Sequence, residues 1–490
     1  MIRPYYSIVI LGSGIAGLAA AKSLSGKGLD ILVIDENTHI GGQLLRGTTG
    51  YISLAAAMVS GFDPVKTRGV QLIRHLKNAR DIHWLNRARV AGIFKDRQLL
   101  VHVDDMPGQP GRCIEIRAGK LILATGARER YLPFPGWTLP GVLSLGAAQI
   151  LLKSHGTLPA RNVLVAGSSP LMAAVASQLI TGQGNIAGIV DENTLSDMRG
   201  FLPLAVHHWP KLLQGGAYIA LLILNRVRHF RGFRVVEASG KEQFESAVIA
   251  RHDRKGRIMP GTEIRVPAGA LAIGHGFVPN IEPGIQAGCR AEYHRDLGGW
   301  IMAVNTTQDH TLFETSLKNI YAVGELTGIG GAHRSYIQGR LCGLSILAAL
   351  EKYPRGRQHQ RFRAAMASLK RENRCQNEYA FFLNRFSRVP DMAYDQIPDP
   401  TLICRCENIT MGTIRKRIGQ GFDTAAALKK AARCGMGRCQ GRICGPVIFD
   451  VVSALTRAEP ESVGFPTSRA PIGNLAIRSL LIPPDHTRNK

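Results

Sequence analysis

The sequence lacks a long uninterrupted apolar run. A membrane-spanning helix needs about 18 or more consecutive apolar residues, and this chain contains no such run. The most apolar early stretch, residues 8–24, is interrupted by glycines and is followed by no small-residue cleavage site, so it is not typical of a signal peptide. We therefore expect no membrane span and a cytoplasmic location.

Acidic residues are scarce as well. The chain has 61 Lys and Arg side chains against 36 Asp and Glu, which gives a formal net charge of +25. This imbalance favours anionic partners and says nothing about the fold. The most basic stretch, residues 351–375, has few aromatic residues and no nucleic-acid-binding motif, so we expect a solvated or partner-facing surface there and no nucleic acid.

The cysteines do not form the pattern of a secreted disulfide framework. There are nine of them, an odd number, and five lie between residues 404 and 444. In a large chain such clustering favours metal or redox chemistry in a reducing compartment. The length of 490 residues, with 45% hydrophobic content, predicts about three domains.

Two segments predict βαβ units. The first 35 residues read as a strand, a tight turn, a helix and a second strand, and the same order recurs from residue 161 to residue 190. Because βαβ units build dinucleotide-binding domains, we expect two such domains. Strands that end in glycine at 121–126 and 271–276 are expected to cross between them.

The turn of the first unit carries a glycine fingerprint with its full context. Gly12 can make the turn, Gly14 lets the backbone approach a pyrophosphate, and Gly17 lets helix and strand pack closely. The helix N-terminus supplies free N–H groups to the phosphates. Asp35, at the end of the next strand, is placed to accept hydrogen bonds from an adenosine ribose. An ordinary glycine-rich turn is the alternative.

Later motifs favour FAD as the dinucleotide. Gly42 and Gln43 follow the acidic residue and allow close backbone approach to a ring system. Gly324 and Glu325, late in the chain, can return to the same site to hold the ribityl or phosphate portion.

This pairing of an early glycine fingerprint with a late Gly-acid motif resembles the two-dinucleotide-domain flavoproteins related to glutathione reductase. That family usually has Asp where Glu325 stands, and Thr125, Gly126 and Gly274 match its domain-crossing motifs. From these motifs we expect FAD contacts at Gly12, Gly14, Gly17, Asp35, Gly42, Gln43, Thr125, Gly126, Gly324, Glu325 and Gly331.

The second fingerprint is degraded. Ser169 and Met172 replace its second and third glycines after Gly167, which crowds the place of a pyrophosphate. Asp191 and Glu192, at the end of the following strand, are expected to repel a 2′-phosphate. NAD, another adenine nucleotide and a purely structural domain all remain open.

A redox-active cysteine pair is missing from the places where disulfide reductases of the glutathione reductase family carry one. No cysteine lies between Gly41 and Arg46, and no Cys-x-x-Cys occurs between residues 114 and 288. The cysteine pair that a dithiol mechanism requires is therefore missing.

Four cysteines near the C-terminus predict a metal-binding module. Cys404 and Cys406 are joined by two helix-like segments to Cys439 and Cys444, so four thiolates can close a compact cage. Such a set suits a [2Fe–2S] cluster, and zinc is the competing metal. Cys434 is the alternative fourth ligand.

The cysteine segment resembles the [2Fe–2S] domain of bacterioferritin-associated ferredoxin, and the whole chain to about residue 455 resembles the large FAD subunit of the opine oxidase, hydrogen cyanide synthase and hydroxyproline dehydrogenase group. The resemblance implies an α/β fold with two dinucleotide-binding domains and a small helical [2Fe–2S] domain. We expect an FAD-binding domain at 1–120 and 276–350, a second dinucleotide-binding-like domain at 121–275, a basic connector at 351–395, the [2Fe–2S] domain at 396–455 and a tail at 456–490.

For function, the resemblance implies an electron-relay subunit of a multisubunit enzyme that oxidises an amino acid, imino acid or opine. Its expected partners are a smaller flavoprotein catalytic subunit, a small ferredoxin-like subunit and a small-molecule amine. No general base stands out in the sequence. The alternatives are a stand-alone NAD(P)H-dependent flavin oxidoreductase and a non-catalytic assembly protein with structural nucleotide and zinc sites.

Overall fold

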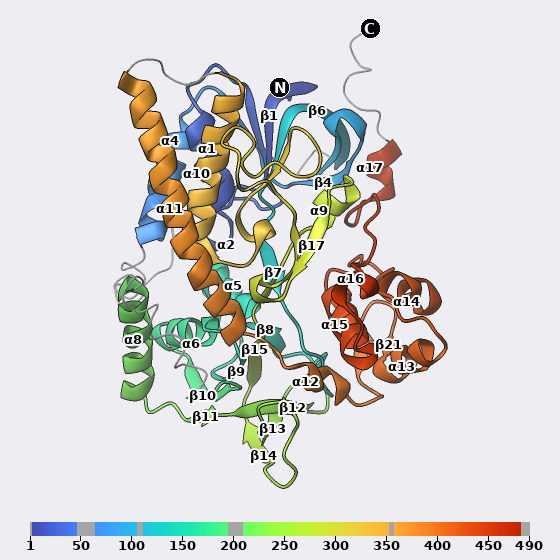
Figure 1. Ribbon diagram of the computed structural model, residues 1–490. Helices are drawn as coiled ribbons and strands as arrows, with labels where there is room; N and C mark the ends of the chain where they lie inside the picture. The colour runs from blue at the N-terminus through green and yellow to red at the C-terminus, as the bar shows by residue number, and fades with distance from the viewer. Residues whose placement is uncertain (1, 47–63, 105–110, 195–208, 352–356, 482–490) are drawn as a thin grey trace.

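The computed structural model describes residues 2–46, 64–104, 111–194, 209–351 and 357–481. They form two open sheets flanked by helices, one above the other in Figure 1, with a small helical module beside them. This arrangement confirms the expected α/β fold with two dinucleotide-binding domains and a small helical domain after them.

The first sheet begins with the predicted βαβ unit. β1 pairs in parallel with β2 on one side and with β6 on the other, while β5 and β4 continue from β6 as an antiparallel meander. β19 also pairs with β6, so the late part of the chain returns to this sheet. The strands are β1 (Tyr5–Leu11), β2 (Ile31–Ile34), β3 (Ile82–Leu85), β4 (Ala88–Ile93), β5 (Gln98–Val103), β6 (Arg112–Leu123) and β19 (Ile320–Ala322).

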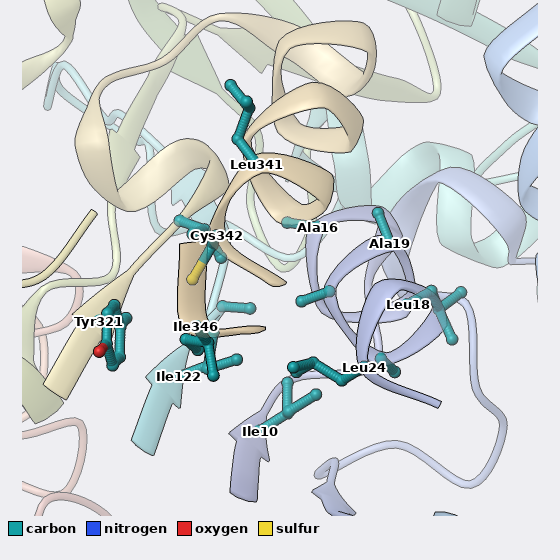
Figure 2. Close-up of a cluster of buried hydrophobic side chains, with 14 of the residues drawn as sticks. Ile10, Ala16, Leu18, Ala19, Leu24, Ile122, Tyr321, Leu341, Cys342 and Ile346 are labelled. Carbon is teal, nitrogen blue, oxygen red and sulfur yellow. The ribbon is translucent and has the colours of Figure 1, made fainter. Parts of the chain in front are cut away.

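Two helices pack tightly against each other over the first sheet. They are α1 (Ile15–Leu24) and α10 (Gly331–Ala349), and a Cβ on Gly339 of α10 would lie 2.1 Å from the carbonyl oxygen of Ala16. Helix α4 (Pro64–Lys77) packs beside α1, and the short α2 (Gly42–Leu45) follows the glycine pair. Figure 2 shows the apolar side chains buried between helices and sheet, among them Ile10, Leu18, Ile122 and Ile346.

The second sheet is fully parallel, in the order β11-β10-β9-β15-β8. Its three central strands, β10, β9 and β15, are mostly apolar and buried, as expected for a covered parallel sheet, whereas the edge strand β11 is polar. The strands are β8 (Val142–Ser144), β9 (Asn162–Gly167), β10 (Asn185–Asp191), β11 (His229–Arg231) and β15 (Ala270–Gly274), and the helices are α5 (Leu145–His155), α6 (Leu171–Thr181) and α8 (Trp209–Leu224). An antiparallel sheet of β12 (Phe233–Ser239), β13 (Ser246–Arg251) and β14 (Ile264–Pro267) packs beside it.

A two-stranded ribbon connects the two halves. β7 (Ala127–Glu129) and β16 (Phe277–Pro279) pair antiparallel directly after the two strand-then-glycine segments that were expected to cross. Between β16 and β19 lie α9 (Glu282–Gln286), β17 (Ala291–His294) and β18 (Gly299–Met302).

The basic connector is largely one helix, α11 (Arg357–Phe386), which runs along α10 (Figure 1). It is less solvated than its composition predicts, because Met366, Leu369 and Ala380 are buried. Its charged side chains lie on the outer surface only. A high net charge in a helical segment therefore does not exclude that one face of the helix is buried.

The C-terminal module has a core of its own. Thr410 and Thr424 cap its first two helices through their side chains, which fixes where each helix begins. A short helix, α12 (Asp391–Asp395), leads into β20 (Leu402–Cys404), β21 (Ile409–Thr410), α13 (Met411–Gly419), α14 (Ala425–Ala432) and α15 (Cys444–Thr456).

The chain beyond α15 folds back instead of extending into solvent. It contains α16 (Pro460–Val463) and α17 (Ile477–Leu481). The backbone N–H of Ile472 donates to the Ala91 carbonyl at 2.8 Å, and His102 and Ser479 are hydrogen-bonded at 3.1 Å. This segment therefore covers the meander edge of the first sheet.

None of the helices in the described ranges combines the length and the apolar character needed to cross a membrane.

The residue limits of the domains stay predictions. β6 ends at Leu123, three residues past the expected limit at 120, and the first sheet includes the whole of it.

Candidate flavin and iron–sulfur sites

The three fingerprint glycines have three different surroundings. Gly12 has φ +104°, and a Cβ there would lie 2.3 Å from the carbonyl oxygen of Ala124. A Cβ on Gly17 would lie 2.0 Å from the Gly12 carbonyl oxygen, so this glycine serves helix packing. Only Gly14 faces open space, with no atom within 4 Å. The gap over Gly14, at the N-terminus of α1, fits a pyrophosphate.

The Asp35 carboxylate is already hydrogen-bonded to neighbouring residues of the protein. Its carboxylate accepts hydrogen bonds from the N–H and hydroxyl of Ser13, at 2.7 and 2.6 Å, and from the N–H and side-chain amide of Asn37, both at 2.8 Å. These bonds hold the glycine turn, although Asp35 also lines the cavity. Glu36 lines the same cavity, is exposed, and is a second candidate for a ribose that the sequence reasoning missed.

The expected contacts near the first crossing lie together. The Thr125 hydroxyl donates to the Asn280 carbonyl at 2.9 Å, and the Asn280 side chain returns a bond to the Thr125 carbonyl at 2.9 Å. Gly126 has φ +70° and open space at its Cβ position. The Gln43 side chain donates a hydrogen bond to the Ala127 carbonyl at 3.2 Å, so the Gly-Gly-Gln turn lies next to Thr125 and Gly126.

Glu325 holds the start of α10. Its carboxylate accepts hydrogen bonds from the N–H groups of Gly330 and Gly331 at 3.2 and 2.9 Å. Burial raises the pKa of Glu325 above its ordinary value, against the field of Arg334. Gly331 has φ +83° and nothing within 4 Å of its Cβ position, so a ligand can approach the backbone there.

One large cavity joins these features. Its volume of about 2250 Å³ exceeds the roughly 300–1,000 Å³ of ordinary small-molecule sites, so FAD would leave room for a further ligand. Two of the expected residues, Gly17 and Gly324, do not line this cavity. The other nine expected residues line the cavity: Gly12, Gly14, Asp35, Gly42, Gln43, Thr125, Gly126, Glu325 and Gly331. That these residues hold FAD stays a prediction, and the open space at the glycines fits it.

At the second fingerprint, the structure corrects one expectation. Glu192 does not face a nucleotide: its carboxylate accepts bonds from Arg234 at 2.7 and 2.8 Å and from His275 at 2.8 Å, and all three side chains are buried. Burial alone would raise the pKa of Glu192, but the Arg234 guanidinium and His275 hold it well below its usual range. Asp191 does line the cavity, and so does Ser169.

Replacing Arg234 by methionine should leave the Glu192 carboxylate buried without its main partner. We expect a loss of about 3–5 kcal/mol in the free energy of unfolding, measured by chemical denaturation at neutral pH. Because the pKa of Glu192 is depressed, the pair stabilises above the unfolded-state pKa of a glutamate and its contribution disappears only as the pH falls toward strong acid. An unchanged unfolding free energy would contradict this assignment.

The four predicted cysteine ligands lie together in the C-terminal module. Cys444, the first residue of α15, donates a hydrogen bond to Cys404 across 3.7 Å between the sulfur atoms. Hydrogen bonds from Cys444 lower the pKa of Cys404 to about 6 and that of Cys439 to about 5, and Cys439 also interacts with Cys406. Within the described ranges, no group of three or more His, Cys, Asp or Glu side chains is arranged to hold a metal ion as it stands.

Cys434 is turned away from this group. Its thiol is fully buried and donates to the Leu428 carbonyl at 3.5 Å. Burial raises the pKa of Cys434 to about 12. The pKa of Cys444 is raised as well, first by its hydrogen bonds to Cys404 and Cys439, so the partners of the two sulfur atoms, and not their pKa values, distinguish them. Backbone N–H groups of Gly435 and Gly441 instead point at the sulfurs of Cys404 and Cys439. The four thiols of this group therefore fit a cluster ligated by four thiolates, and that Cys444 is the fourth ligand stays a prediction.

Comparison with known proteins assigns the chain to a family. Residues 6–339 match the pyridine nucleotide-disulphide oxidoreductase family, and residues 402–454 match the BFD-like [2Fe-2S] binding domain. The chain is 33% identical to the HcnB subunit of hydrogen cyanide synthase from Pseudomonas aeruginosa, over 89% of this chain and 90% of that protein. It is 29% identical to an opine oxidase subunit of Agrobacterium tumefaciens, over 98% and 92% of the two chains.

A solved structure confirms the fold along nearly the whole chain. L-proline dehydrogenase from P. horikoshii superposes with a TM-score of 0.67 at 21% identity, covering 97% of this chain and 79% of that one. The matched families imply FAD and a [2Fe–2S] cluster as cofactors, as the sequence predicted. The chain therefore belongs to the pyridine nucleotide-disulphide oxidoreductase family, as a flavin-dependent oxidoreductase with a BFD-like [2Fe–2S] binding domain, related to HcnB and to subunits of opine oxidase.

Proposed function

We propose that this chain is the electron-relaying subunit of a multisubunit dehydrogenase or oxidase that acts on an amino acid, imino acid or opine. Two relatives that match most of this chain are themselves named as subunits, of hydrogen cyanide synthase and of opine oxidase. Its proposed partners are a smaller flavoprotein that oxidises the amine and a small ferredoxin-like subunit, in the cytoplasm. When bound, FAD supplies two-electron chemistry and the cluster supplies one-electron transfer.

The observation that carries the proposal is a junction between the cavity and the cluster module. Arg128, in β7, donates through Nε to the Arg442 carbonyl at 2.6 Å, and Arg442 lies in the loop between two predicted ligands. Its other nitrogens bond Asn280 at 2.8 Å and Glu282 at 2.5 and 3.1 Å. Because Asn280 also pairs with Thr125, one network joins the expected flavin wall to the cluster loop.

Further contacts fix the module against the crossing segment. Arg130 pairs with Asp450 of α15 at 2.5 Å, and Tyr394 donates to the same carboxylate at 2.8 Å. The Trp137 indole donates to the Leu402 carbonyl at 2.7 Å, two residues before the first ligand. These contacts are buried or half-buried, so the module is a fixed part of the wall. A relay between two redox groups benefits from such a constant separation.

Replacing Arg128 by methionine should slow electron transfer between flavin and cluster at least tenfold, because the cluster loop loses its anchor and Glu282 is left without a partner. The flavin content should stay at the wild-type value. Transfer is measured by flash photoreduction of the flavin, and the double variant R128M/E282Q should recover part of the rate. The exposed Arg254→Met is the matched control, and an R128M rate equal to it would refute the junction.

A nucleotide at the second fingerprint is a separate proposal. Ser169 and Pro170, at the β9–α6 turn, line the same cavity, so NAD or another adenine nucleotide there would share space with FAD. Anaerobic reduction of the flavin by NADH alone would support the stand-alone oxidoreductase. Absence of that reduction, with reduction by substrate in the presence of a partner flavoprotein, supports the relay.

A further inference from the structure

Five basic side chains from different parts of the chain line one side of the cavity. They come from the turn after α2 and from helices α4, α5, α8 and α10, which lie on the left of the molecule in Figure 1. We call this set the basic wall: Arg46, Lys66, Lys153, Lys211 and His333. None of the eleven expected FAD contacts is among them.

Lys153 is the most informative member of the basic wall. It lies in the last turn of α5, and its ammonium makes no hydrogen bond or ion pair with any residue in the described ranges. Burial, together with the like charges of Lys66 and Arg46, lowers its pKa to about 8. A half-buried cation held beside other cations is costly unless an anion neutralises it.

Glu372 of α11 forms an ion pair with one member of the basic wall, His333, at 2.8 Å. Burial lowers the pKa of His333 below its ordinary value, Arg68 and Lys211 act in the same direction, and Glu372 acts against them. Arg46 donates to the neutral amide of Asn37 at 2.7 Å. By sequence, residues 47–63 contain one acid and no Lys or Arg, and residues 195–208 contain one acid and one Arg, so the two segments together carry a formal net charge of −1, less than the positive charge of the lysines and arginine of the wall.

We propose that the basic wall binds an oxyanion, the carboxylate or phosphate group of a small molecule that enters the cavity beside FAD. The volume of about 2250 Å³ leaves room for such a ligand. Lys153 and Arg46 would make charge-assisted hydrogen bonds to it, and Lys66 and Lys211 would add to the positive field. This site is independent of the relay, since it requires no electron transfer.

The test uses the full chain loaded with FAD and cluster. Lysines are labelled by reductive ¹³C-methylation, and the Lys153 signal, assigned by its loss in Lys153→Met, is titrated with pH. Without added anion we expect Lys153 to titrate clearly below the other lysines. Succinate and pyrophosphate, as carboxylate and phosphate probes, should each be tested for a saturable upward shift of this pKa. A response to one probe identifies the chemical class, and a response to both supports a general oxyanion site.

Lys153→Met should weaken binding of the effective probe by about tenfold, the typical effect of losing one charge-assisted hydrogen bond. Lys95→Met, an exposed lysine away from the cavity, should bind the probe as wild type does. If Lys153→Met fails to fold, Arg46→Met serves instead and should raise the pKa of Lys153 by removing a like charge. An ordinary pKa of Lys153 in the FAD-loaded protein would overturn the proposal, because FAD itself would then neutralise the wall. A lowered pKa that neither probe shifts would overturn it as well, because neither anion would then bind.

Discussion

Replacing Cys444 by serine should abolish the [2Fe–2S] cluster. The Cys444 sulfur lies 3.7 Å from that of Cys404 and also bonds Cys439, so it is central to the thiol group. Iron and acid-labile sulfide should fall from about two each per chain to near zero, and the electron paramagnetic resonance signal of the reduced protein should disappear. The flavin content should remain, because no cavity glycine is touched.

The matched control is Cys434→Ser, in the same loop region. Its buried thiol bonds the Leu428 carbonyl, so serine there should keep the full iron content and lose only some stability. If Cys434→Ser loses the cluster and Cys444→Ser retains it, the assignment of the fourth ligand is wrong. Zinc in place of iron in the wild-type protein would contradict the cluster assignment altogether.

Replacing Gly14 by valine should yield a folded protein without FAD. No atom lies within 4 Å of a Cβ at this position, so the chain can fold around the larger side chain. The side chain would nevertheless fill the space where the pyrophosphate approaches the N-terminus of α1. We expect at least a hundredfold weaker FAD binding, which corresponds to about 2.7 kcal/mol. Flavin absorbance after gel filtration measures it.

Two further variants separate binding from folding. Gly17→Val should fail to fold, since even a Cβ there would lie 2.0 Å from the Gly12 carbonyl oxygen. Gly419→Ala, at the end of α13 with open space around it, should keep FAD and full stability. Wild-type flavin content in Gly14→Val would show that FAD does not bind over this turn.

Local features were predictable from the sequence because short-range sterics fix them. The glycine turn, the two βαβ units and the cysteine module each follow from residues close together in the chain. The return of residues 320–325 to the first sheet was also expected, because Gly324 and Glu325 matched a known motif.

Features that depend on distant partners were not predictable. Glu192 turns inward because Arg234, 42 residues later, pairs with it. Asp35 bonds Ser13 and Asn37, so its role in the turn became visible only with the side chains in place. The basic wall consists of side chains from five separate segments, and no spacing in the sequence predicts that they lie together.

The most direct test of the relay is flash photoreduction of the flavin in the anaerobic full-length protein, with the cluster followed by its visible bleaching. We expect cluster bleaching to follow flavin reduction with a rate independent of protein concentration, because both groups belong to one chain and the module is fixed to the cavity wall. A rate proportional to protein concentration, or a cluster that stays oxidised, would contradict it.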